Sequence, residues 1–318
     1  MKKILKWMTI VVFSALAVGG MAAFGMEALA RYFAEDRFSP EGQLVDVGSH
    51  RLHVVLKGEG GPTVIFESGL DSYGYLPWFK VQDSVSDVTT TLAYDRAGIL
   101  WSEDSPEEKS LRSIANDLSA LLQALEVPKP YIVVGHSVAG ITLRRFIDSN
   151  RDDIAGVVLV DVSHPSQTER YPPKVPPRFL MSLMSNSGFI RRAASGRLYP
   201  NTEERDSINQ VGPALMHRSN KGQYDEAANL LEMSEQAGEI DSFGSIPLTV
   251  ISATAMLQNI ESMNPEQKEV AIMRADLQQE LLKLSTNSKQ VFAAKNNHYV
   301  QLEEPDLVAD AILDLIGR

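Results

Sequence analysis

One serine stands in a sequence context that would make it a nucleophile. Residues 131–140, Tyr-Ile-Val-Val-Gly-His-Ser-Val-Ala-Gly, predict a buried strand, a sharp turn at Ser137 and then a helix. A serine on such a turn has strained backbone angles, and the residues two before and two after it must be small. Gly135 and Ala139 meet this demand, although most turns of this kind have glycine where Ala139 stands. Gly140 eases the close approach of helix and strand.

A serine hydroxyl is a weak nucleophile at neutral pH, so it needs a base, and the base needs an acid that orients it. His298 lies just past the last expected strand and before the closing helix, at the carboxyl edge where strands of such sheets present ligands. It is the best placed of the six histidines. His164 is the one serious rival, and it stands too close to the expected acid to be preferred. We therefore predict His298 as the base.

The acid is expected at the end of the strand that follows the nucleophile. Asp161 ends the run Val-Leu-Val-Asp, where it can reach a histidine approaching from the last strand. The more usual place follows the penultimate strand, but residues 253–257 hold no carboxylate and the next one is Glu261. The alternative is that Asp161 merely caps a turn or an adjacent helix. We predict Asp161 as the acid.

Backbone N–H groups are the simplest donors to the negative charge that develops on a carbonyl oxygen. We expect one from Leu70, in the loop after the third strand, and one from Val138, at the positive end of the helix that begins at the turn. Gly69 is expected to permit the backbone twist that turns the Leu70 amide inward.

Short β-branched runs alternate with longer amphipathic stretches, which is the pattern of an α/β sheet. Residues 88–94 and 154–160 predict strands, and residues 111–125 repeat apolar side chains at helical spacing. From residue 163 to 245 this pattern gives way to Met-rich helical segments interrupted by proline, which we interpret as an inserted helical lid. The expected division is an anchor or signal segment 1–30, a linker 31–43, a first core part 44–162, the lid 163–245 and a second core part 246–318.

The N-terminal segment has the length of a membrane span. Lys2, Lys3 and Lys6 precede an uncharged run from Trp7 to Met26, which as a helix would extend about 30 Å, the thickness of a bilayer's hydrocarbon core. The apolar region of a cleaved signal is usually only about 7 to 15 residues. We therefore favour an uncleaved single-pass anchor through residues 7–26 in the cell membrane.

The alternative is a secreted protein that is cleaved near Ala30, after Ala-Leu-Ala. In both cases the rest of the chain lies outside the cytoplasm, because lysines at the extreme N-terminus hold that end inside.

The composition limits the partners and cofactors. A net charge of −11 disfavours nucleic acid, because phosphate binding needs clustered Lys and Arg. The chain has no cysteine, which excludes disulfides, thiolate catalysis and Cys-ligated zinc. No HExxH pair or EF-hand loop occurs. We expect neither a cofactor nor a metal ion, and the oligomeric state is left open.

From Gly42 to the C-terminus the chain resembles the α/β-hydrolase superfamily. The resemblance rests on the Gly-His-Ser turn, Phe66-Glu67-Ser68-Gly69-Leu70, Tyr94-Asp95-Arg96-Ala97-Gly98, the strand ending in Asp161, and His298 before Glu304-Pro305. It implies an eight-stranded, mostly parallel sheet with helices on both faces, a lid inserted after strand six, and hydrolysis without a cofactor. Many relatives have His-Gly where this chain has Ser68-Gly69. Asp95 and Arg96 are expected to form a structural ion pair and turn.

Taken together, Ser137, Asp161 and His298 predict a serine hydrolase that cleaves a carboxylic ester or related acyl bond of a small molecule through an acyl-enzyme. The same residues would also serve amide or peptide cleavage, lactone opening, acyl transfer or perhydrolysis. A non-catalytic binding member of the fold is the alternative from another class. Epoxide or haloalkane hydrolysis is disfavoured, since the family members that carry out these reactions have a carboxylate residue at the turn where this chain has Ser137.

Overall fold

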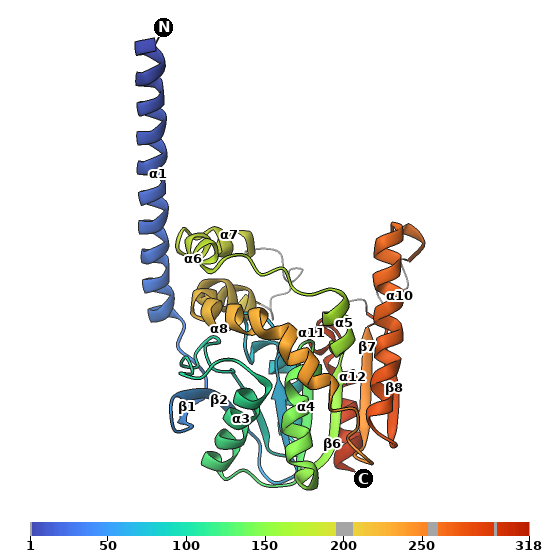
Figure 1. Ribbon diagram of the computed structural model, residues 1–318. Coiled ribbons are helices and arrows are strands. Elements are labelled where there is room, and N and C mark those ends of the chain that lie inside the picture. The colour runs from blue at the N-terminus through green and yellow to red at the C-terminus, as the bar shows by residue number, and fades with distance from the viewer. Residues whose placement is uncertain (1, 195–205, 254–259, 296–297, 318) are drawn as a thin grey trace. The chain divides into compact units, whose positions relative to one another are not determined.

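The computed structural model of the chain describes four ranges of residues (Figure 1), namely 2–194, 206–253, 260–295 and 298–317. The chain divides into two compact units. One, which we call the N-terminal unit, contains Met1–Pro40 and Pro176–Asn220. The other, which we call the sheet unit, contains Glu41–Val175 and Lys221–Arg318.

The sheet unit is built on one sheet of eight strands in the order β1-β2-β4-β3-β5-β6-β7-β8. β2 pairs antiparallel with β1 and β4, and every other pair of neighbours is parallel. The predicted eight-stranded, mostly parallel sheet is confirmed. The strands are β1 (Gln43–Asp46), β2 (Arg51–Lys57), β3 (Thr63–Glu67), β4 (Thr91–Tyr94), β5 (Tyr131–His136), β6 (Ile154–Val160), β7 (Leu248–Ala253) and β8 (Ser288–Ala293).

Helices cover both faces of the sheet, as predicted (Figure 1). α3 (Leu111–Leu125) and α4 (Ala139–Ser149) pack together on one face, and α2 (Phe79–Ser86) and α12 (Pro305–Ile316) pack together on the other. Because both faces are covered, an inner parallel strand such as β6 is a continuous apolar run. The remaining helical elements of the sheet unit are η1 (Leu76–Trp78), η2 (Arg151–Asp153), α5 (Pro165–Arg170), η4 (Ile260–Ser262), α10 (Pro265–Glu280), η5 (Leu281–Leu284) and α11 (Val300–Glu303).

The described residues between β6 and β7 form helices rather than strands. After α5 come α6 (Arg178–Asn186), α7 (Phe189–Ala194) and α8 (Asp206–Gly238). Within this segment, boundaries between the two compact units fall at residues 175/176 and 220/221, so the segment contributes to both. A lid function for residues 163–245 stays a proposal.

The N-terminal unit begins with α1 (Lys2–Arg37), which continues past residue 30 into the segment predicted as a linker. Within the described ranges, α1 is the one helix long and apolar enough to cross a membrane, with a mean hydropathy of 1.9 over 18 residues and none of that stretch buried. A helix of this kind at the N-terminus is compatible with a membrane anchor or with a signal sequence.

Candidate active site

Ser137 occupies the predicted strained turn between β5 and α4. Its φ is 55°, in the left-handed region that residues with a side chain rarely adopt. The Ser137 N–H donates to the carbonyl of Val160 at 3.3 Å, and its own carbonyl accepts from the Ser163 N–H at 2.7 Å. The prediction of strain is confirmed, and these two bonds hold the turn against the end of β6.

The small residues around the turn are required by close packing. A Cβ on Gly135 would lie 2.7 Å from the Ala139 Cβ and 2.6 Å from Leu143 Cδ1. A Cβ on Gly140 would lie 2.4 Å from the Ser163 carbonyl oxygen. Ala139 is itself fully buried, and its methyl group fits because the residue opposite it is glycine.

We expect Gly140→Ala to destabilise the protein by about 1–3 kcal/mol, because the new methyl group would overlap a backbone oxygen that has no rotamer to escape into. Gly238→Ala in α8 is the matched control, since the nearest atom to its Cβ would be Pro165 Cβ at 3.9 Å. The thermal unfolding midpoints of both variants in detergent check this. Equal midpoints for the two variants would show that the turn is not packed as described.

The structure brings the three predicted residues Ser137, His298 and Asp161 into one chain of hydrogen bonds. Ser137 Oγ lies 2.9 Å from His298 Nε2, and His298 Nδ1 lies 2.5 Å from Asp161 Oδ2. Since the carboxylate only accepts, the proton belongs on Nδ1, which leaves Nε2 to accept from the serine hydroxyl. This is the arrangement in which a histidine can withdraw a proton from serine.

Asp161 is buried, and both of its carboxylate oxygens are engaged. Oδ1 accepts from the Ala253 N–H at 3.2 Å, and Oδ2 faces His298 and lies 3.4 Å from Arg274 Nη2. Burial by itself raises the pKa of Asp161, but the hydrogen bond and charge of His298, with Arg274, outweigh it and hold that pKa below its usual value. Oδ1 thus links the end of β6 to β7, and Oδ2 serves both the histidine and Arg274.

The ring of His136 contacts both the backbone and the ring of His298. Its Nε2 donates to the His298 carbonyl at 2.9 Å, and the two ring centroids lie 4.6 Å apart. Burial, reinforced by the neighbouring His298, lowers the pKa of His136 to about 3. His136 is therefore neutral at physiological pH and adds no competing charge beside the serine.

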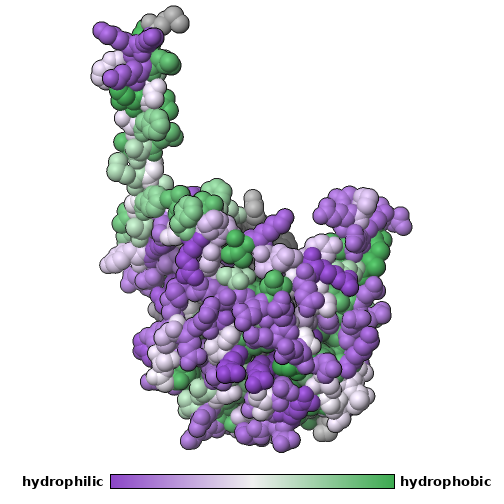
Figure 2. Space-filling model, in the orientation of Figure 1, coloured by the Kyte–Doolittle hydropathy of each residue, from purple (hydrophilic) through white to green (hydrophobic). Residues whose placement is uncertain are grey.

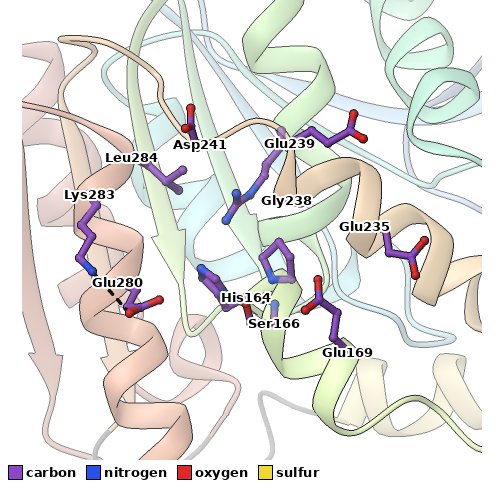
Figure 3. Close-up of a pocket in the computed structure, with 12 residues that line it drawn as sticks. His164, Ser166, Glu169, Glu235, Gly238, Glu239, Asp241, Glu280, Lys283 and Leu284 are labelled. Carbon is purple, nitrogen blue, oxygen red and sulfur yellow. Dashed lines mark hydrogen bonds and ion pairs between the residues drawn. The ribbon is translucent and has the colours of Figure 1, made fainter.

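The rival histidine, His164, does not contact Ser137. Its Nδ1 accepts from the Ser166 N–H at 3.2 Å and so caps α5. His164 lines a cavity of about 640 Å³ (Figure 3), and the described lining of that cavity includes none of the three hydrogen-bonded residues. The lining is rich in carboxylates, which are Glu169, Glu235, Glu239, Asp241 and Glu280.

The loop that carries Leu70 lies directly against the serine. A Cβ on Gly69 would lie 3.1 Å from the Ser137 Cβ and 3.0 Å from His136 Nδ1. The φ of Gly69 is outside the left-handed region, and the close approach of these atoms is itself a reason for glycine at this position. The Leu70 and Val138 side chains pack in one apolar cluster. Neither of their amides donates to another group within the described ranges, which leaves both for a ligand.

A buried arginine fixes this loop. Arg96 donates to the carbonyls of Ser68 at 2.6 Å and Gly69 at 2.9 Å. Its charge is balanced by two buried carboxylates, Glu67 at 3.0 Å and Glu226 of α8 at 2.8 Å. These bonds hold the loop backbone in place without a ligand, which is what a preorganised donor needs.

The expected ion pair between Asp95 and Arg96 is wrong. Asp95 accepts from His53 Nδ1 at 2.8 Å and from the Tyr75 N–H at 2.8 Å, whereas Arg96 pairs with Glu67 and Glu226. Asp95 thus faces β2 and the segment before η1, whereas Arg96 faces the loop after β3 and α8, so the two charges have different partners.

A second carboxyl group that the sequence did not single out lies beside the site. Asp71 follows Leu70 directly and is buried. Its Oδ1 accepts from the Tyr73 N–H at 2.8 Å, and its Oδ2 accepts from the Tyr299 hydroxyl at 3.1 Å. Because Tyr299 follows His298 in the sequence, this bond joins the Leu70 loop to the histidine loop. Burial raises the pKa of Asp71 to about 6.

We expect Asp71→Asn to raise the thermal unfolding midpoint at pH 7.5 and to leave it nearly unchanged near pH 4. The folded-state pKa of Asp71, about 6, lies above the usual 3.8, so its contribution to stability is present below pH 4 and is lost as the pH rises through 6. The shift sets an upper limit of about 3 kcal/mol on the gain at pH 7.5. A lower midpoint than wild type at pH 7.5 would contradict this account of Asp71.

Within the described ranges, no group of three or more His, Asp or Glu side chains is arranged to hold a metal ion. In that part of the chain, no set of metal ligands therefore lies beside Ser137, His298 and Asp161.

The chain matches one protein-family model and several curated proteins. The family model described as "Alpha/beta hydrolase family" matches residues 64–311. "Probable transporter efuK" of Hormonema carpetanum is 26% identical over 300 residues, which cover 85% of this chain and 42% of that protein. The chain thus spans less than half the length of that relative. "Uncharacterized protein YqjL" of Bacillus subtilis (strain 168) is 24% identical over 263 residues, with 81% of this chain and 85% of that protein covered.

Solved structures share the fold. A thermophilic esterase from Thermogutta terrifontis has a TM-score of 0.64 at 18% identity and covers 87% of this chain and 98% of its own. The enol-lactonase from Burkholderia xenovorans LB400 has a TM-score of 0.65 at 17% identity, with 87% and 100% covered. The epoxide hydrolase CorEH has a TM-score of 0.63 at 19% identity, with 86% and 98% covered. At identities this low, the likeness establishes the fold alone.

Proposed function

Since the chain belongs to the α/β-hydrolase family, we propose that it is a serine hydrolase that cleaves a carboxylic ester or related acyl bond through an acyl-enzyme on Ser137. One observation carries the proposal, which is the hydrogen-bond chain from Ser137 Oγ through His298 to Asp161. The residue at the strained turn is a serine rather than a carboxylate. A serine that attacks an acyl carbon gives an acyl-enzyme that water can hydrolyse, which also favours this chemistry.

In the first half of the reaction, Ser137 Oγ attacks the acyl carbon while His298 Nε2 takes the serine proton. The tetrahedral intermediate then collapses, and the leaving alcohol departs with that proton. In the second half, His298 takes a proton from water, the hydroxide attacks the acyl-enzyme, and the proton returns to Ser137 as the acid is released. Asp161, as a buried carboxylate, stabilises the imidazolium that forms twice in this cycle.

The negative charge on the substrate oxygen needs donors that are already in place. The amides of Leu70 and Val138 fill this role in our proposal, because they flank Ser137 and have no other acceptor within the described ranges. Arg96 acts as a positioning residue, since its bonds to the Ser68 and Gly69 carbonyls hold the first of these amides.

A lactone is an internal ester, so lactone opening would use the same groups and is the second candidate. Amide or peptide cleavage, acyl transfer and perhydrolysis also remain within the reach of a serine, a histidine and an aspartate in this order. A non-catalytic binding role is disfavoured, because such a role does not require three hydrogen-bonded groups around a strained serine.

A substrate panel separates these possibilities. We expect the purified full chain in detergent to hydrolyse at least one p-nitrophenyl ester among acetate, butyrate, octanoate and palmitate, and to leave styrene oxide intact. The ester that is hydrolysed fastest indicates how long an acyl chain the site accepts. A series of lactones tests the second candidate. Turnover of the epoxide without any ester hydrolysis would overturn the proposal.

We also propose that α1 is an uncleaved anchor that holds the sheet unit outside the cytoplasm. Besides the length of the apolar run, one contact supports retention of the segment: Glu27, which is buried, pairs with Arg191 Nη2 at 2.8 Å. Cleavage near Ala30 would remove Glu27 and leave Arg191 without this partner. The mass of the mature membrane-bound protein tests the anchor, and a protein that lacks residues 1–30 would support secretion instead.

A further inference from the structure

The turn between α6 and α7 is fastened to α1 at the point where the apolar run of α1 ends. Glu27 is the first charged residue after that run, and it pairs with Arg191 of α7. Arg31 donates to the Ser185 carbonyl of α6 at 2.7 Å. A Cβ on Gly188 would lie 2.3 Å from Glu27 Oε2, so the turn itself touches α1. All of these residues belong to the N-terminal unit.

These contacts set the height of α6 and α7 relative to a bilayer. If the run from Trp7 to Met26 fills the hydrocarbon core, Glu27 lies at the boundary with the headgroups. Arg31 is four residues further along the helix, or about 6 Å. The segments bound to these two residues therefore lie at the level of the headgroups, beside the lower part of α1 in Figure 1.

α6 and α7 expose large apolar side chains at this level. Phe179 is 74% exposed, Leu183 is 51% exposed and Phe189 is 57% exposed. In Figure 2 the hydrophobic surface of α1 continues onto these helices. A face of this kind is expensive to leave in water, and it is typical of helices that lie in a membrane interface.

The charge of these helices fits the same surface. Residues 178–194 contain three arginines and no Asp or Glu, in a chain whose net charge is −11. Basic residues beside an apolar face favour the headgroups of anionic lipids. Glu27 of α1 balances Arg191, and the segment with this partner keeps a net positive charge where the negative surface of a membrane would be.

We propose that α6 and α7 form a second membrane contact, in which Phe179, Leu183 and Phe189 insert among the lipid chains of the leaflet where α1 ends. The occupant of the apolar face is the lipid bilayer itself. The proposal goes beyond the serine chemistry and rests on the membrane anchor proposed for α1.

The chain has no cysteine, so a single introduced cysteine can be labelled at one known place. We would reconstitute the full chain in vesicles of phosphatidylcholine and phosphatidylglycerol and attach the environment-sensitive fluorophore NBD at Phe179→Cys or Phe189→Cys. Lipids with a nitroxide near the headgroup should then remove most of the emission from both labels. A label at Phe13→Cys, in the apolar run, should be quenched by lipids with a nitroxide deep in the acyl chain. Lys283→Cys, whose side chain is 77% exposed in the sheet unit, supplies the reference in water.

The outcomes separate the two membrane proposals. Quenching at Phe13, Phe179 and Phe189 supports both. Quenching at Phe13 alone retains the anchor and overturns the second contact. Labels at Phe179 and Phe189 that are shielded both from nitroxide lipids and from aqueous iodide would show that a second copy of the chain covers this face, which also overturns it. An unquenched label at Phe13 removes the anchor and the inference with it.

Discussion

Ser137→Ala is expected to abolish ester hydrolysis, with a loss of about a millionfold in kcat, which is the size of effect seen when a serine nucleophile is removed from such a catalytic group. No other serine hydroxyl is hydrogen-bonded to His298 among the described contacts, so none can replace it. The fold should survive, because the turn is held by backbone bonds to Val160 and Ser163 that the substitution leaves intact.

Ser119→Ala provides the matched control for this experiment. Ser119 bonds only to the Ala115 carbonyl within α3 among the described contacts, so the variant should retain full turnover. Steady-state rates and far-ultraviolet circular dichroism of the three proteins check the prediction. Retention of more than a small fraction of the activity by a folded Ser137→Ala protein would show that another group is the nucleophile.

Asp161→Asn is expected to lower kcat by about 10⁴-fold with little change in KM. The amide of asparagine can donate to His298 Nδ1 as readily as accept from it, and the imidazole would then carry its proton on Nε2, facing Ser137. In that tautomer the histidine cannot take the serine proton. The full pH profile of kcat, measured for both proteins, distinguishes this loss from a simple shift of the optimum.

Glu261→Gln tests the other place in the sequence where an acid was considered. Glu261 lies in η4 and is exposed, so this variant should hydrolyse esters at the wild-type rate. The opposite result, with Asp161→Asn active and Glu261→Gln inactive, would move the acid to the segment after β7.

The features of the site that could be predicted from the sequence are those whose causes are local. The strained turn at Ser137 is specified by a strand, a helix and small neighbours within ten residues, and the structure has all of them. β6 begins and ends at the predicted residues, because its run is continuously apolar. The strand predicted from Val88 begins only at Thr91, since the N–H groups of Val88 and Thr89 bond to the Val85 carbonyl and complete α2. Such a hydrogen bond leaves no trace in a hydrophobic pattern.

The features that were missed depend on contacts between distant parts of the chain. Arg96 and Glu226 are 130 residues apart, and Asp71 and Tyr299 are 228 apart. No spacing or motif marks either pair, and the sequence offered Asp95 as the nearest partner for Arg96. Both pairs form only in the folded chain, where α8 brings Glu226 to Arg96 and the loop after β8 brings Tyr299 to Asp71.

The most direct test of the proposed function is the site at which a fluorophosphonate reacts. We expect the full chain to gain the mass of one phosphonyl group, and peptide mapping to place that group on Ser137. His298→Ala should slow the labelling greatly, because the serine would lose the base that is 2.9 Å from its oxygen. An adduct on another residue, or undiminished labelling of the Ser137→Ala protein, would contradict the assignment of Ser137 as the nucleophile.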